Sequence, residues 1–331
     1  MTYEAFKEEF MSRLAERAER SEQIGTYQLF EDGASSEELK EKNFIRETNI
    51  KYNKIESDVL KGDFLSILHK QCEESLARYE MKYLFQSYEA KGWDFVWEII
   101  EKNLETVTHF DMQSLLQNVH QYDRIQDRLI LRAINYTDNR YTLKNCVYRQ
   151  IGDIALVLYL FVAQTEEYGL TTTKVPKAAF EEWGKDMEEV LENALVNTNI
   201  RSVPRMYTAP KESYKPSYQT GAYMALDAKC QLGKYGLGRC TFTTYPQLNG
   251  AISFWYPGVQ EKIAEMAGGD YYVAFTGIHE FHVHPVNTVP ARQILGRLKD
   301  MNKYMNKEDE ILSRKVYLYR ADTKELTALE L

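Results

Sequence analysis

Four side chains that could bind a metal ion or transfer a proton lie within one short segment: His279, Glu280, His282 and His284. If this segment is a strand, a period of two places Glu280, His282 and His284 on one face and His279 on the opposite, more apolar face. Imidazole and carboxylate groups are ligands that zinc, iron and manganese accept. The sequence therefore predicts a candidate metal site made of His282, His284 and Glu280.

Two other interpretations of this cluster are open. Histidine titrates near neutral pH, so the same groups could act as acid–base groups without a metal, with Glu280 as the candidate catalytic residue. The three side chains could also be the solvated polar face of a strand. The helical HExxH zinc motif is absent because the spacing is HExHxH, and a metal site would need a further ligand from elsewhere in the chain.

Weaker candidates lie outside this segment. Asp153 precedes a long apolar run and could project a carboxylate from the start of a strand, or it could cap a turn. Arg201, Arg205 and Lys211 could bind an anionic ligand, or they could belong to a solvated loop. Neither a GxSxG nucleophile elbow nor a phosphate-binding glycine motif is present.

Composition and charge restrict the class of protein. The formal net charge of −8 disfavours nucleic-acid binding, which requires clustered basic side chains. The longest apolar run, Ile154–Ala163, is too short to span a bilayer as a helix, and the N-terminus has no signal-peptide pattern. The four cysteines form no CxxC pair, as expected of free thiols. We therefore expect a cytoplasmic protein without membrane contact.

Periodicity predicts both helices and strands in the first two thirds of the chain. Residues 73–107 form the clearest helical stretch, which Gly92 interrupts, so we expect a helical hairpin there. The apolar second half of residues 147–163 favours a buried strand and leaves a buried helix open. The other predicted elements are helices at 3–19 and 176–198 and strands at 64–68 and 127–136.

The C-terminal third has the sharpest pattern. It predicts a strand–helix–strand–strand–helix–strand order, with strands at 250–256, 271–275, 278–285 and 316–320 and helices at 257–268 and 290–305. The chain is therefore expected to be an α+β protein in which helices pack on mixed or antiparallel sheets.

A composition shift suggests a boundary near residue 200. All eight prolines lie at or after Pro176, and residues 201–221 contain three prolines and three tyrosines. We expect this segment to be a Pro/Tyr-rich loop or linker. It would separate an N-terminal α+β region, residues 1–200, from a C-terminal α+β region, residues 222–331.

Several segments together carry a family resemblance. They are Gly250-Ala251, Ile278-His279-Glu280, and a closing element with Asn302, Ile311–Ser313 and Val316-Tyr317; LKGDFLSI, YRQIGDIALVLY and Ala194–Tyr207 are compatible with the same pattern. With them, the chain from about residue 55 resembles a family of uncharacterised bacterial proteins from Firmicutes, domain of unknown function 5688. The resemblance implies a bacterial cytoplasmic protein but no activity, and His282 and His284 lie outside its pattern.

Two classes of function follow. The first is a binding module without a standard catalytic motif, which would hold a partner protein or a small ligand on the Pro/Tyr loop or on a sheet face. The alternative is a metal-dependent enzyme of the hydrolase type, in which a divalent ion at Glu280, His282 and His284 activates a water molecule. The sequence decides neither whether the protein is an enzyme nor whether it has a cofactor.

Overall fold

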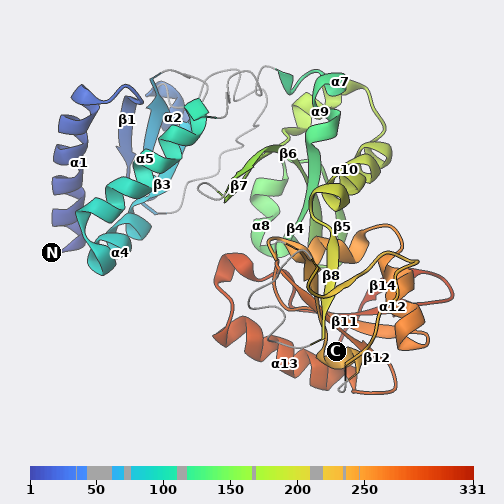
Figure 1. The fold of residues 1–331 in the computed structure, drawn as a ribbon. Coiled ribbons are helices and arrows are strands. Elements are labelled where there is room, and N and C mark those ends of the chain that lie inside the picture. The colour runs from blue at the N-terminus through green and yellow to red at the C-terminus, as the bar shows by residue number, and fades with distance from the viewer. Residues whose placement is uncertain are drawn as a thin grey trace. The chain divides into compact units, whose positions relative to one another are not determined.

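The computed structural model describes residues 1–34, 36–42, 62–70, 76–109, 118–165, 169–208, 219–233, 236–245 and 247–331. Contacts divide the chain into two compact units (Figure 1). The N-terminal unit comprises Met1–Arg124 and Val162–Trp183, and the C-terminal unit comprises Ile125–Phe161 and Gly184–Leu331. Helices pack on antiparallel sheets in these units, which confirms the predicted α+β class.

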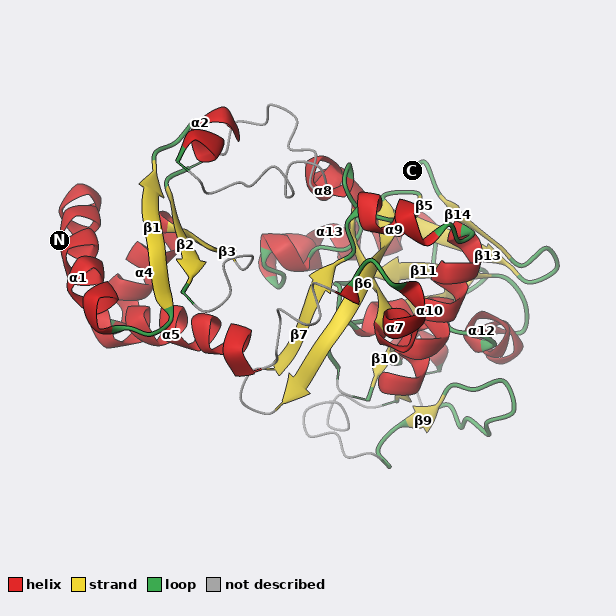
Figure 2. Cartoon of the chain, turned by 90° about the horizontal axis from the view of Figure 1, so that it is seen from above, coloured by secondary structure: helices red, strands yellow, loops and turns green. Residues whose placement is uncertain are grey.

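A three-stranded antiparallel sheet with the strand order β1-β2-β3 forms the centre of the N-terminal unit. Helices α1, α4 and α5 lie on one side of this sheet (Figure 2). The elements are α1 (Tyr3–Arg20), β1 (Ile24–Phe30), α2 (Ser36–Glu41), β2 (Phe64–His69), β3 (Leu76–Glu80), α4 (Met81–Lys91), α5 (Trp93–His109), α7 (Tyr122–Ile125), β7 (Gly169–Lys174) and α9 (Lys177–Trp183).

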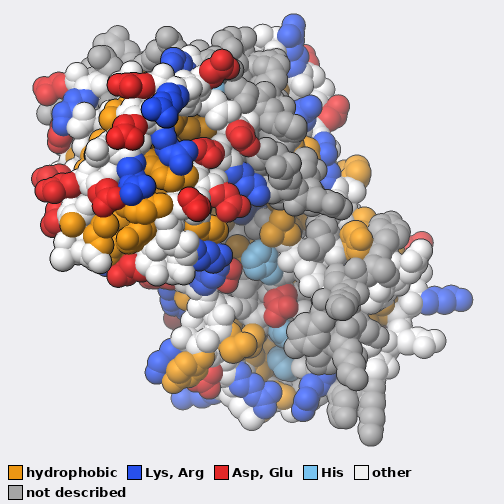
Figure 3. Space-filling model, turned by 60° about the vertical axis from the view of Figure 1, so that its left-hand side comes forward, with side chains coloured by type: hydrophobic (Ala, Val, Ile, Leu, Met, Phe, Trp, Pro, Cys, Tyr) orange, Lys and Arg blue, Asp and Glu red, His pale blue; other side chains and the backbone are white. Residues whose placement is uncertain are grey.

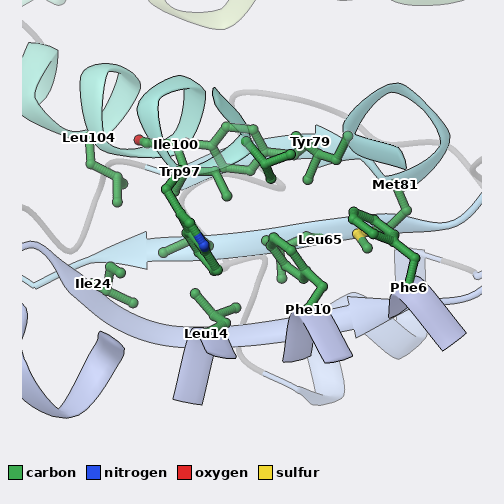
Figure 4. Close-up of a cluster of buried hydrophobic side chains, with 13 residues drawn as sticks. Phe6, Phe10, Leu14, Ile24, Leu65, Tyr79, Met81, Trp97, Ile100 and Leu104 are labelled. Carbon is green, nitrogen blue, oxygen red and sulfur yellow. The ribbon is translucent and has the colours of Figure 1, made fainter. Parts of the chain in front are cut away.

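Helix α1 forms as the sequence predicts. The Thr2 hydroxyl caps it by accepting a hydrogen bond from the Ala5 amide at 3.3 Å. Its apolar stripe of Phe6, Phe10 and Leu14 is fully buried and points toward side chains of α5 such as Trp97 (Figure 4). Burial of each such side chain contributes about 1.5–3 kcal/mol, so this stripe fixes α1 against the rest of the unit.

The predicted helical stretch at 73–107 is only partly correct. Residues Leu76–Glu80 form strand β3, in which Tyr79 pairs with Leu65 of β2, and the first helix begins at Met81. The sequence LARYE is compatible with the period of a helix and with that of a strand. It forms a strand because it pairs with the buried strand β2. The predicted break is confirmed, because Gly92 ends α4 with a positive φ of 79° that L-residues rarely adopt.

The C-terminal unit contains a seven-stranded antiparallel sheet with the order β14-β13-β11-β12-β10-β8-β9. In a second sheet β6 lies between β4 and β5; the last residues of β6, from Val162, belong to the N-terminal unit, as does its other pairing strand, β7. The elements are η1 (Gln126–Arg128), β4 (Leu129–Asn135), α8 (Tyr136–Leu143), β5 (Tyr148–Ile151), β6 (Ile154–Thr165), α10 (Met187–Arg201), β8 (Pro204–Tyr207), β9 (Ala222–Tyr223), η2 (Leu237–Arg239), β10 (Thr241–Thr244), η3 (Gly250–Trp255), α12 (Val259–Ala267), β11 (Tyr271–Phe275), β12 (Phe281–Pro285), α13 (Ala291–Tyr304), η4 (Glu308–Glu310), β13 (Val316–Arg320) and β14 (Glu325–Ala328).

Two predicted elements are each split in two. In the stretch 147–163 the predicted buried strand is confirmed as β6, Gly152 and Asp153 form the turn that joins it to β5, and the helical alternative is wrong. The predicted helix at 176–198 is interrupted at Gly184, and Asp186 caps the second helix, α10, by accepting from the Glu189 amide at 3.0 Å. Asp186 favours the start of a new helix at this point, because its side chain accepts a hydrogen bond from an amide that the first helical turn leaves unpaired.

The predicted strand at 250–256 is wrong, since these residues form the 3₁₀ helix η3. Phe254 of η3 packs edge-to-face against Phe275 and Phe281 at 5.5 and 5.3 Å between ring centroids. These aromatic contacts bury residues 250–256 without strand pairing. A short apolar run is equally compatible with a strand and with a buried helical turn, so the sequence does not distinguish them. The predicted order of the C-terminal third holds only if β10 takes the place of this first strand.

The predicted Pro/Tyr-rich segment is described only at its ends. Pro204–Tyr207 form β8, which pairs with β10 inside the seven-stranded sheet, and residues 209–218, with Lys211, lie outside the described residues. The predicted boundary at 201–221 stays a prediction. In the described part of the chain, no helix has the length and apolar character needed to cross a membrane.

Candidate functional sites

Strand β12 presents the predicted histidines on one face of the seven-stranded sheet. His282 pairs with Ala274 and His284 with Tyr272 of the neighbouring strand β11. Helix α13 packs on this face, where Ile294 and Ala274 belong to one small hydrophobic cluster. Phe281 and Val283, which point to the other face, are fully buried, so the predicted division of β12 into a polar and an apolar face is correct.

Glu280 precedes β12 and contacts His282, with 3.7 Å between the carboxylate Oε1 and the ring Nε2. The Thr276 hydroxyl donates to the same carboxylate at 3.4 Å. The interaction with His282 holds the pKa of Glu280 below its ordinary value, against the opposing effect of burial. The Glu280 carboxylate is therefore ionised at neutral pH beside a half-buried imidazole.

His284 is more enclosed, with 8% of its surface exposed. Its ring lies against Gly238 of η2, where an added Cβ would come within 2.9 Å of Nδ1. Burial lowers the pKa of His284 to about 4, with smaller contributions from His282 and Arg297. His284 is therefore neutral at neutral pH.

His279 lies apart from β12, in the loop that precedes it. Its Nδ1 accepts a hydrogen bond from the Asn249 amide at 3.0 Å, so the proton of a neutral ring is on Nε2. Burial lowers the pKa of His279, partly offset by the carboxylates of Glu310 and Glu280. His279 thus joins its loop to the start of η3.

The structure brings Glu280 and His282 together but adds no further ligand beside them. Within the described ranges, no three His, Cys, Asp or Glu side chains gather in a group that could hold a metal ion. The metal site at Glu280, His282 and His284 remains a prediction. Figure 3 shows pale-blue histidine side chains near an acidic one on the molecular surface.

Asp153 is buried, and the C-terminal segment satisfies its carboxylate. It accepts hydrogen bonds from the Ser313 hydroxyl at 2.7 Å, the Arg314 amide at 2.8 Å and the Tyr317 hydroxyl at 2.6 Å. Three donors on one buried carboxylate form a structural connection, because they occupy most of its acceptor sites. The turn before β6 is thereby fastened to β13.

Arg201 and Arg205, the other predicted anion-binding residues, have partners. Arg201 donates to the Asp127 carbonyl at 3.0 Å and stacks over Phe161. Arg205 is buried in β8 and stacks over Tyr223. Both guanidinium groups therefore contribute to packing of the C-terminal unit.

A second candidate site, which the sequence did not suggest, lies within the N-terminal unit. A groove of about 620 Å³ opens between the C-terminal half of α1, the start of β1 and α5. The buried side chains of Ile24, Trp97 and Leu104 line it together with charged groups. This α1–α5 groove is defined by the following lining residues: Arg13, Glu16, Arg17, Arg20, Ser21, Gln23, Ile24, Trp93, Asp94, Trp97, Glu101, Leu104 and Glu105.

Two parallel arginine–tryptophan stacks form part of the α1–α5 groove. The guanidinium of Arg13 lies 4.5 Å from the ring centroid of Trp93, and that of Arg17 lies 4.5 Å from Trp97. Arg17 also donates to Glu101 at 2.5 Å across the groove. Each cation–π contact contributes about 0.5–1 kcal/mol at an exposed site. The stacks hold two planar cations in fixed orientations at the surface.

The aromatic core below continues these stacks. Phe6 stacks on Trp93 at 5.1 Å between centroids, and Phe10 stacks on Trp97 at the same distance. On the N-terminal unit, Figure 3 shows apolar side chains surrounded by basic and acidic ones. The tryptophans are therefore held rigidly, with aromatic rings and guanidinium groups as neighbours.

The sequence contained a signal for this groove. Arg13 and Arg17 are four residues apart on α1, and Trp93 and Trp97 are four residues apart on α5, so each pair shares a helix face. The arginines of an amphipathic helix normally face solvent. Only the packing of α1 on α5 shows that these arginines lie over indole rings.

Comparison with known proteins gives a family and no activity. The family described as "Family of unknown function (DUF5688)" matches residues 3–321, and the chain belongs to it. Neither a curated protein nor a solved structure matched the chain.

The segments that carried the family resemblance meet within the C-terminal unit. The Ala251 amide donates to the Ile278 carbonyl at 3.2 Å, and Asn302 donates to the Ser313 carbonyl at 2.9 Å. The Ala251–Ile278 contact joins two of these segments, and the Asn302–Ser313 contact lies within the closing element.

Proposed function

We propose that this protein is a binding module that holds its ligand in the α1–α5 groove. The observation that carries the proposal is the groove itself, in which two ordered indole rings and three arginines surround about 620 Å³. Ligand sites in proteins commonly occupy about 300–1,000 Å³ and combine apolar walls with a few placed polar groups. Tryptophan and arginine are also the side chains that most often dominate binding energy.

The groove is ordered before any ligand binds. Trp97 is 3% exposed and is held between Phe10 and Arg17, so its ring needs no rearrangement to form the floor. A site that is already ordered loses less conformational entropy on binding. The Arg13 and Arg17 side chains keep 44% and 43% of their surface exposed, which leaves them accessible to a ligand.

The test follows the indole N–H resonances of the four tryptophans by NMR while short peptides and amino acids are added. Trp93 and Trp97 report on the groove. Trp183, whose indole donates to the Val119 carbonyl at 2.8 Å, and Trp255, which stacks on Phe275, are internal controls. We expect saturable shifts confined to Trp93 and Trp97.

Two further results bear on the proposal. The Arg17→Ala variant should weaken the binding of any peptide that shifts Trp97, whereas Arg292→Ala, an exposed arginine on α13, should not. If no compound shifts Trp93 or Trp97 up to millimolar concentration, or if shifts spread over all four indoles, the proposal is wrong.

A further inference from the structure

The charges of the α1–α5 groove are sorted by wall. Helix α1 contributes three arginines, Arg13, Arg17 and Arg20, and one acid, Glu16; helix α5 contributes acids only, and these are Asp94, Glu101 and Glu105. The groove therefore has one predominantly basic wall and one acidic wall, above a floor of Ile24, Trp97 and Leu104.

The two walls run in the same direction. Arg13 meets Trp93 and Arg17 meets Trp97, so advancing four residues on α1 corresponds to advancing four on α5. Asp94 therefore lies at the level of Arg13, Arg20 lies at the level of Ile100 beside Glu101, and Glu105 lies about one turn further along α5. The basic and the acidic wall thus face each other along the groove, and the Arg17–Glu101 ion pair bridges them in the middle.

Among the residues that the structure describes, each end of the groove has one unpaired charge, Asp94 at the Arg13 end and Arg20 at the other, whereas Arg13 is itself paired with Glu9. Within the described ranges, no hydrogen bond or ion pair is formed by the side chains of Arg20 and Asp94, and both are exposed. Polyanions and polycations are each disfavoured, because either would lie against a wall of like charge. A ligand with both signs of charge avoids this repulsion.

An extended peptide provides such charges at matching distances. Successive side chains of an extended chain point to opposite sides, and alternate side chains are about 6.6 Å apart. Arginines four residues apart on a helix are about 6 Å apart along its axis. Acidic side chains at positions i and i+2 would meet the basic wall, and basic side chains at i+1 and i+3 would meet the acidic wall.

We propose that the α1–α5 groove binds a short extended peptide in which acidic and basic side chains alternate. This inference rests on the proposed function and specifies its ligand class. A groove that spans Arg13 to Arg20 is about 10 Å long, which accommodates three to four extended residues.

The experiment compares two capped peptides of the same composition and net charge, Ac-Glu-Lys-Glu-Lys-NH₂ and Ac-Glu-Glu-Lys-Lys-NH₂, with the full chain. Dissociation constants come from the Trp93 and Trp97 indole shifts. We expect the alternating peptide to bind about fivefold more tightly, since each exposed ion pair contributes no more than about this factor.

A charge-reversal series makes the assignment specific to the walls. Arg20→Glu should weaken the alternating peptide, the double variant Arg20→Glu/Glu105→Arg should recover much of the loss, and Arg292→Glu on α13 should have no effect. Equal affinity for the two peptides would overturn the alternating ligand but leave the groove a binding site. Absence of indole shifts with both peptides and with the wider peptide panel would overturn the proposed function as well.

Discussion

Gly250 and His279 touch through their backbones. A Cβ at Gly250 would lie 2.5 Å from the His279 carbonyl oxygen, closer than real Cβ atoms approach, and the Thr243 hydroxyl and Thr244 amide crowd the same position. Gly250→Ala should therefore lower the free energy of unfolding by about 1–3 kcal/mol, as overpacking does. Chemical denaturation measures this loss.

Gly296 is the matched control. It lies in α13, and a Cβ there would meet no atom within 4 Å. Gly296→Ala should raise stability by about 0.5–1 kcal/mol, because alanine favours helix formation. Equal effects of the two substitutions would contradict the close approach of Gly250 to His279.

Tyr317 supports the buried Asp153 carboxylate. Its hydroxyl donates to Asp153 at 2.6 Å and also lies 3.1 Å from the Ile151 carbonyl. Tyr317→Phe should cost about 1–3 kcal/mol, since it removes a donor from a buried charged group. Tyr304→Phe, at a tyrosine that is 70% exposed, should change the melting temperature little. A Tyr317→Phe variant as stable as the parent would exclude a stabilising role for this contact.

The sequence predicts best those elements whose stabilising contacts are local. Helix α1, with its Thr2 cap and regular apolar stripe, was predicted within one residue of its end. The segment Leu76–Glu80 was not, because its conformation depends on pairing with β2. Similarly, the run from Gly250 is apolar because it packs on side chains of β11 and β12, and the sequence shows no period that would reveal those contacts.

The candidate sites divide in the same way. The period of two placed His282 and His284 on the polar face of β12, as the structure shows. The α1–α5 groove was missed because it requires two helices that lie about 80 residues apart in the sequence. Such a groove appears only when both partners of each stack are placed in space.

Asp63 should make stability depend on acid pH. It accepts hydrogen bonds from Lys7 at 2.8 Å and Tyr3 at 3.0 Å. Burial alone would raise the pKa of Asp63, but these donors and the Asp32 amide hold it below the ordinary value. The folded state thus releases this proton more readily, so its contribution is complete above about pH 3.9 and is lost as the pH falls through the folded pKa.

The variant Asp63→Asn isolates this contribution. It should cost about 1–2 kcal/mol at neutral pH, and its unfolding free energy should fall less steeply than the parent's below about pH 4. Asp300→Asn, at an exposed site on α13, should retain the parental pH profile. Urea titrations between pH 2 and 7 compare the three proteins, and parallel curves for Asp63→Asn and the parent would contradict the assignment.

Arg17 connects α1 to α5 by a stack and an ion pair. Arg17→Ala should lower stability by about 1 kcal/mol, because both contacts are partly exposed. Arg17→Lys keeps the charge without the planar group, and it should recover less than half of that loss. Arg292→Ala serves as the control for loss of an exposed arginine. Full recovery by lysine would show that stacking on Trp97 contributes nothing.

The metal hypothesis for β12 has its own test. If Glu280, His282 and His284 bind an ion, protein purified without an affinity tag should contain near-stoichiometric zinc, iron or manganese. The His282→Ala/His284→Ala variant should lose it, and chelator should lower the melting temperature of the parent only. His120→Ala, at a histidine paired with Glu182, is the control. Absence of metal from the parent, with unchanged melting after chelator, would dismiss the hypothesis.

The connection between Asp153 and Ser313 spans 160 residues of chain. Ribosomes add about 5–20 residues per second, so about 8–30 s separate the synthesis of the two residues. During this interval the carboxylate exists without the three donors that surround it in the finished protein. By contrast, the core that joins Phe6 to Leu104 is complete within the first third of translation. The nascent chain therefore carries every side chain of this cluster long before the C-terminal unit can close.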